Sequence, residues 1–168
     1  MVRNTNGAVN YAPLVCLSFP MPQPHAYTQA ERFFLRYVDP SQITTTADKL
    51  RWHRYRKGLR QKDVAELAGL DRKTYTQYES QTREYYPPQT IERLAAALSV
   101  TIEELLDNYN LFLYRDQGTQ IKAIRTHHNL TQHQLANQLG ISLGVLKKWE
   151  QNRVRISKES WRKLMQIR

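Results

Sequence analysis

The sequence predicts an all-α protein in which two small helical bundles follow one another, preceded by a proline-rich arm. Its 168 residues are enough for one ordinary domain or two small ones, and 40% hydrophobic with 24% charged residues is typical of globular proteins. A pattern of 23 residues occurs twice, at 58–80 and at 129–151, with a constant offset of 71. Capping residues and glycines divide most of the chain into short helical segments. Together these observations predict two related cores.

The arm is expected to comprise residues 1–43. Proline fixes φ and lacks an N–H donor, so a high density of prolines favours an extended chain. The first 27 residues contain four of them: Pro13, Pro20, Pro22 and Pro24. One short helix is predicted from Gln29 to Val38, because Thr28 and Glu31 have the spacing of a capping box.

The first bundle is expected at residues 44–107, with five short helices. Threonines at 44–46 can cap the first helix, while Gly58 and Gly69 permit the left-handed turns that end the first two. The predicted helices cover 44–58, 61–68 and 72–80, then a segment with Ile91, Leu94, Ala95 and Leu98 on one face, then a segment with Ile102, Leu105 and Leu106.

Residues 108–117 are expected to connect the bundles. The apolar run Leu111 to Tyr114 predicts packing between the two halves, because a solvated linker would be polar. The second bundle, residues 118–168, is expected to have one helix fewer. The first of these helices is predicted to end at His128, and the next two are predicted to cover 132–139 and 143–151. The last helix is predicted to carry Trp161, Leu164 and Ile167.

The charge of the chain favours a polyanionic partner such as nucleic acid. It has 25 Lys and Arg against 15 Asp and Glu, a net charge of +10. The single cysteine, Cys16, cannot form an internal disulfide, which is typical of the reducing cytoplasm. No run of about 18 apolar residues is present, so no membrane span is predicted.

The sequence predicts neither an enzyme nor a cofactor. It has no phosphate-binding glycine-rich loop, no nucleophile elbow and no zinc-protease helix. His127, His128 and His133 do not predict a metal site, because no Cys or carboxylate lies at ligand spacing beside them and adjacent histidines on a helix diverge.

The residues that are the same in both copies are those a helix-turn-helix needs. Ala65 and Ala136 are small enough for two helices to approach closely, and Gly69 and Gly140 make the tight turn between them. The signature Q-x-x-[VL]-A-x-x-x-G-[LI], followed nine residues later by a glutamate, resembles the phage-repressor and Cro type of helix-turn-helix domain, also called the xenobiotic-response-element family.

The resemblance implies two buried ion pairs and a DNA-binding face in each copy. The ion pairs would join Arg54 to Glu79 and Arg125 to Glu150, 25 residues apart in both copies. In this family the third helix enters the major groove and the start of the second faces the phosphate backbone. In the first unit the base contacts would therefore come from Arg72, Lys73, Thr76 and Gln77, and the phosphate contact from Gln61.

The second unit departs from this pattern. Its matching base-contact positions are Leu143, Gly144, Lys147 and Lys148, and its matching phosphate position is Gln132. Residues 44–106 hold 11 basic and 9 acidic side chains, whereas residues 117–168 hold 10 basic and only 2 acidic ones. We therefore expect the first copy to discriminate bases and the second to bind phosphates, with Leu143 still able to meet a thymine methyl. Further phosphate contacts are expected from Arg153, Arg155, Lys158, Arg162 and Lys163.

The sequence thus predicts a cytoplasmic transcription regulator, such as a repressor, that binds double-stranded DNA through tandem domains. If extended, the connecting residues would span about 36–40 Å, close to the roughly 34 Å between major-groove faces one turn apart. Two other functions stay open: a protein-interaction adaptor of the bridging-factor type, and the antitoxin of a toxin–antitoxin pair with a protein partner on the arm. A homodimer is open as well. An adaptor would not need Arg72, Lys73 and Gln77 together.

Overall fold

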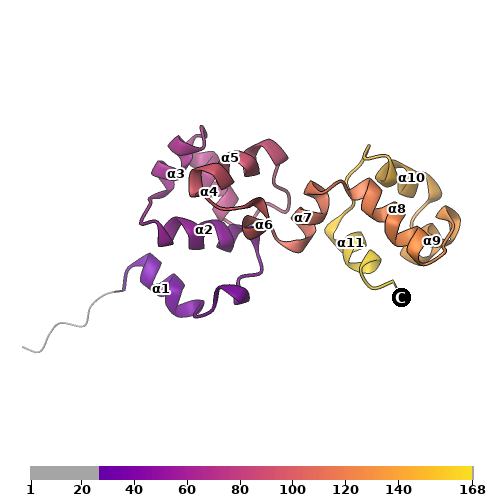
Figure 1. Cartoon of the computed structure of the whole chain (residues 1–168), viewed down its shortest axis with the longest axis horizontal. Helices are drawn as coiled ribbons and strands as arrows, with labels where there is room; N and C mark the ends of the chain where they lie inside the picture. Colours follow the sequence, from indigo (N-terminus) through magenta and orange to yellow (C-terminus); the bar gives the residue numbers. More distant parts are fainter. Residues whose placement is uncertain (1–26, 168) are drawn as a thin grey trace, which may run out of the picture.

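The computed structural model of this chain describes residues 27–167 (Figure 1). This part of the chain forms eleven α-helices, α1 to α11, one short 3-10 turn and no strand, which confirms the predicted all-α fold. The proline-rich stretch lies almost entirely at 1–26, outside the described residues, so its extended conformation stays a prediction. The last part of the arm is described, and it contains α1 at Gln29–Arg36.

The first unit has five helices, as predicted. They are α2 Thr46–Arg56, α3 Gln61–Leu67, α4 Arg72–Glu79, α5 Pro88–Leu98 and α6 Ile102–Leu105. Side-chain oxygens of Thr45, Asp71 and Thr101 accept a backbone N–H at the starts of α2, α4 and α6. These caps fix where each helix begins and therefore how the short helices can pack around Leu50, which is fully buried.

The second unit has the four predicted helices. They are α8 Gln117–His127, α9 Gln132–Leu139, α10 Leu143–Glu150 and α11 Lys158–Leu164. Ile121, Leu135 and Leu146 are fully buried at its centre. Because α11 ends at Leu164, Ile167 packs against this core from beyond the helix and not from within it.

The two units share their backbone conformation as well as their sequence pattern. Left-handed φ angles recur at three pairs of positions separated by 71 residues: Gly58 and Asn129, Gly69 and Gly140, and Gln81 and Asn152. An L-residue adopts this conformation at a cost, and asparagine tolerates it better than most. The repeat is therefore kept at the points where the chain turns, even where the residue type has changed.

The connector is a helix, α7, spanning Asn108–Tyr114. Leu111 and Tyr114 pack against the first core, whereas Tyr109 and Phe112 are buried in the second, so α7 lies between the units as Figure 1 shows. The apolar run therefore packs between the two halves, as predicted, and the connector does not use the roughly 36–40 Å that it would span if extended. Seven helical residues rise only about 10 Å, and the helix forms because both of its faces are covered by apolar side chains.

Both ion pairs implied by the family resemblance are present and lie inside the units. Arg54 Nε donates to Glu79 Oε1 at 2.6 Å, and Arg125 Nε donates to Glu150 Oε1 at 2.7 Å. Each pair joins the first helix of its unit to the helix that follows the turn. Each arginine also donates to a backbone carbonyl, that of Leu59 or Leu130.

The first pair has more partners and is more deeply buried than the second. Glu79 also accepts from Arg54 Nη2 and from the Tyr75 hydroxyl, at 2.9 and 2.6 Å. Side-chain exposure is 7% for Arg54 but 18% for Arg125. Burial alone would lower the pKa of the Arg54 guanidinium, but its hydrogen bonds to Glu79 and the charge of that residue raise it above its ordinary value. Arg54 is therefore a permanent cation in the core.

A contact between the units involves Arg155, which was expected to bind phosphate. Its guanidinium carbon lies 3.7 Å from the centroid of the Tyr85 ring, which belongs to the loop after α4. Arg155 precedes α11, so this stacking joins the two units beside α7. An arginine stacked on an aromatic face contributes through the ring quadrupole as well as through packing.

Replacing Glu79 with alanine should destabilise the first unit by about 3–5 kcal/mol, because Arg54 would stay buried without its partner. Glu150→Ala should cost less, since Arg125 is more exposed and no tyrosine hydroxyl loses its acceptor. Urea denaturation, with hydrogen exchange assigning the loss to each unit, measures both values. An equal loss in the two units would contradict this ranking.

The stacking of Arg155 on Tyr85 should appear as a coupling between the units. In a double-mutant cycle of Arg155→Ala and Tyr85→Ala, we expect a coupling free energy of about 0.5–1 kcal/mol, the value for an exposed cation–π contact. The matched control replaces Arg153, an exposed arginine of the same loop, which should show no coupling to Tyr85. A coupling free energy of zero between Arg155 and Tyr85 would contradict the prediction that their stacking joins the two units.

Candidate nucleic-acid interface

The first helix-turn-helix consists of α3, the turn at Gly69 and α4. Val64 and Ala65 of α3 are buried against α4, and Gly69 has a φ of 62°, which lets the chain turn sharply between the helices. Tyr75 and Tyr78 bury the inner face of α4. That burial leaves the opposite face of α4, including its first turn, open to solvent.

The four expected base-contacting residues of the first unit lie on α4 outside the core. Arg72, Lys73 and Thr76 are exposed, and Gln77 is half-buried. Their positions follow from the Asp71 cap, whose side chain accepts the Thr74 N–H at 2.8 Å and so fixes the start of the helix. The helix thus presents two cations and two hydrogen-bonding side chains.

Gln61, expected to contact phosphate, is held within the unit by its side chain. Its Nε2 donates to Glu79 Oε2 at 2.8 Å, and its Oε1 accepts from the Thr76 hydroxyl at 3.3 Å. An amide nitrogen has two N–H groups, so one remains for a phosphate oxygen. The same residue therefore joins the start of α3 to the ion pair and to the outer face of α4.

Arg83 is a candidate contact that the sequence did not indicate. Its Nη2 donates to Gln77 Oε1 at 2.5 Å, and its guanidinium lies 4.9 Å from the Tyr78 ring centroid. It is exposed, in the irregular loop after α4. Arg83 lies outside the helical periodicity and corresponds to Val154 in the second copy, so only the folded chain shows that Arg83 lies beside Gln77.

The second helix-turn-helix, α9 and α10 with Gly140 between them, repeats this geometry. Gln132 Nε2 donates to Glu150 Oε2 at 2.6 Å, as Gln61 does to Glu79. On α10, Leu143 is half-buried, while Lys147 and Lys148 are exposed. Gly144 has no side chain to offer, so this helix presents cations without a bidentate hydrogen-bonding side chain at its start.

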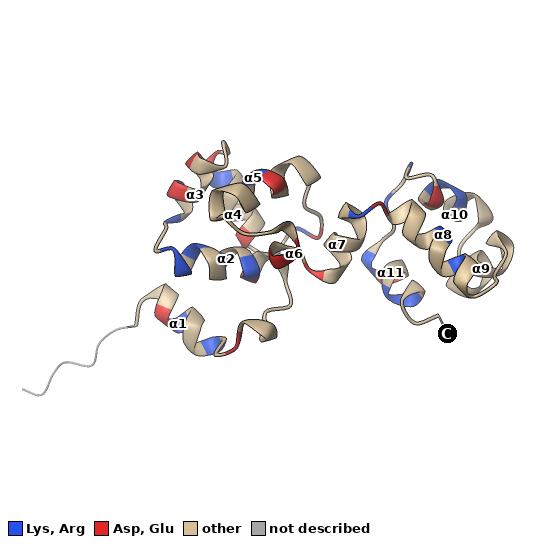
Figure 2. Ribbon diagram, in the orientation of Figure 1, with Lys and Arg blue, Asp and Glu red and all other residues tan. Residues whose placement is uncertain are grey.

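The remaining expected phosphate contacts do not share one environment. Arg153 is exposed in the loop after α10, as are Arg162 and Lys163 on α11. Arg155 stacks on Tyr85 instead, and Lys158 is half-buried with its nitrogen 6.0 Å from the Tyr109 ring centroid. In Figure 2, Lys and Arg lie along α8, α10 and α11 with few acidic residues among them.

From 27 to 167 there is no cluster of three or more His, Cys, Asp or Glu side chains able to hold a metal ion. Among the helices of the same range, none has the length and apolarity needed to cross a membrane.

Comparison with protein families identifies both motifs independently. A family model described as a helix-turn-helix domain matches residues 47–107, and a second, described as helix-turn-helix, matches residues 121–167. No curated protein and no solved structure matches the chain significantly. Domains of this kind indicate DNA binding. The chain therefore contains two tandem helix-turn-helix domains of the Cro/C1 type.

Proposed function

We propose that this chain is a cytoplasmic, sequence-specific transcription regulator that binds double-stranded DNA. The observation that carries the proposal is the exposed face of α4. It combines Arg72 and Lys73 with Thr76 and Gln77 on a helix whose inner face is buried. Arginine can donate two hydrogen bonds to guanine, and glutamine can pair with the edge of adenine, so this face suits base recognition in a major groove.

The two domains contribute differently to DNA binding. The first domain has nearly balanced charge and a hydrogen-bonding recognition helix, whereas the second has 10 basic and 2 acidic residues between 117 and 168. Phosphate contacts supply affinity that does not depend on sequence and that weakens with salt. We therefore assign base discrimination mainly to α4, and phosphate affinity mainly to Lys147, Lys148 and Arg153.

The phosphate contacts at Gln61 and Gln132 use the donors left free by the ion pairs. In both domains the side-chain amide donates one N–H to the buried glutamate, which fixes its orientation. The second amide N–H and the backbone N–H groups at the start of the helix can then donate to a phosphate oxygen. The buried ion pair thus also orients a DNA contact.

Arg72→Ala and Gln77→Ala should each relax sequence preference at one or two base pairs. A bidentate base contact discriminates by about 1–3 kcal/mol, so the specificity ratio should fall roughly 5- to 150-fold per substitution. Selection from randomised DNA with the intact protein, repeated with each variant, measures this. Arg56→Ala, at an exposed arginine on α2, is the control. Unchanged preferences in both variants would exclude α4 as the recognition helix.

Lys147→Ala with Lys148→Ala should weaken binding without altering the preferred sequence. Removing two phosphate contacts should reduce the slope of log K against log salt by about 1.8. Binding of the selected duplex between 50 and 200 mM salt gives the slope, and repeated selection gives the preference. A changed preference with this double variant would mean that α10 also recognises bases.

A further inference from the structure

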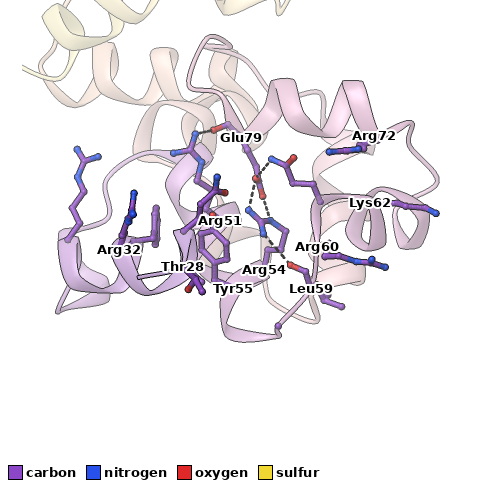
Figure 3. Close-up of a pocket in the computed structure, with 16 residues that line it drawn as sticks. Thr28, Arg32, Arg51, Arg54, Tyr55, Leu59, Arg60, Lys62, Arg72 and Glu79 are labelled. Carbon is purple, nitrogen blue, oxygen red and sulfur yellow. Dashed lines mark hydrogen bonds and ion pairs between the residues drawn. The ribbon is translucent and has the colours of Figure 1, made fainter. Parts of the chain in front are cut away.

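A groove of about 1130 Å³ lies between α1 and the first helix-turn-helix, and its walls are strongly basic (Figure 3). Arg32 and Arg36 of α1 line one side, while Arg60, Lys62 and Arg72 line the other. The wall formed by α1 lies outside residues 47–107, the part that matches the family model. The groove therefore adds a surface that the helix-turn-helix alone does not have.

Part of the positive charge in this groove has no acidic partner among the described residues, because four of its seven cations pair with carboxylates and three do not. Glu79 is the one acidic residue among those that line it, and its carboxylate is buried against Arg54. Within residues 27–167, the guanidinium groups of Arg32, Arg36 and Arg72 form no ion pair with a carboxylate. Three cations therefore stand in the groove without a counter-charge from the described chain.

Packing of α1 on α2 holds its arginines in place. Phe33 is buried, with its ring centroid 5.4 Å from that of Tyr55, and Phe34 lies edge-on to Trp52 at 5.0 Å. The Tyr37 hydroxyl donates to Asp48 Oδ2 at 3.0 Å, after the end of α1. Arg32 and Arg36, four residues apart, are consequently on a docked helix and not on a free tail.

The side chains of residues 1–26 offer no carboxylate to neutralise this groove. Residues 1–26 contain no aspartate or glutamate and one basic residue, Arg3. The anion that suits the groove must therefore come from another molecule. Arg72 indicates that this molecule is DNA, because Arg72 lines the groove and is also the first residue of α4, the proposed recognition helix. A duplex in contact with α4 places its own phosphates next to Arg72.

We propose that the groove binds the sugar-phosphate backbone of the duplex that α4 recognises, with Arg32 and Arg36 of α1 contacting phosphates beside the recognised bases. This inference rests on the proposed function and extends it to a helix outside the family match. Guanidinium groups suit this role, because their planar donors fit two phosphate oxygens at once. The first domain thereby gains phosphate affinity in spite of its nearly balanced charge.

The test compares how the DNA affinity of the full-length wild type and of the double variant Arg32→Ala with Arg36→Ala depends on salt concentration. On the duplex selected by the wild type, the slope of log K against log salt should fall by about 1.8, with the sequence preference unchanged. Between 50 and 200 mM salt, the wild type should then lose about twelvefold more affinity than the variant. Ethylation interference should show lost phosphate contacts beside the recognised bases.

Two matched variants separate this effect from a loss of charge or of folding. Arg56→Ala with Lys57→Ala removes the same charge from the last residue of α2 and the residue after it, neither of which lines the groove. This variant should leave the slope near the wild-type value. Arg32→Lys with Arg36→Lys keeps the charge and should restore most of the slope. Circular dichroism confirms that each variant is folded, and alanine favours helix at both positions.

The outcomes distinguish the two proposals. If the wild type selects a sequence but Arg32→Ala with Arg36→Ala keeps its salt slope, the groove does not bind the backbone and the proposed function stands. If the wild type selects no sequence from randomised duplex DNA, the proposed function fails and this inference fails with it. An equal loss of slope in the Arg56 and Lys57 variant would also overturn the inference, because the effect would then be general to the domain.

Discussion

The buried arginine–glutamate pair is the interaction on which each domain depends. In the first domain it joins α2 to α4, and the Gln61 amide adds α3 to the same carboxylate. Three helices thus meet at Glu79, so the angle between the two helices of the motif is fixed by charged hydrogen bonds as well as by apolar packing. The second domain repeats this with Glu150 and Gln132. A buried charge without its partner is costly, which makes any other arrangement of these helices unfavourable.

The two copies share their buried contacts and turns but differ in the side chains exposed on α4 and α10. Turn conformations, ion pairs and glutamine contacts recur at an offset of 71 residues, whereas Arg72 is replaced by Leu143 and Lys73 by Gly144. The surface of α4 can donate hydrogen bonds in a fixed geometry, while that of α10 offers flexible lysines. Two copies of one fold can therefore differ in selectivity and in salt dependence without any change in their cores.

The helices could be predicted from sequence because their causes are local or repeated, whereas the two ion pairs were implied by the resemblance to a known family. Caps such as Thr45 and turns such as Gly69 mark helix ends within a few residues, and two copies show which residues the frame needs. Contacts between distant segments that the resemblance does not imply could not be predicted. The sequence around Arg155 does not indicate Tyr85 as its partner. Arg32 lines the groove only because α1 packs on α2.

The connector determines how the domains can act together. With a flexible linker of the same length, the two domains would move independently of one another. Once one domain had bound, the effective concentration of the other at its own site would depend on the length of the linker. Here α7 has one side in each core, and Arg155 stacks on Tyr85 beside it. Moving one domain relative to the other exposes apolar surface of α7, at roughly 25 cal/mol for each Å². The distance between α4 and α10 is therefore governed by the packing of α7 and not by the length of the connecting chain.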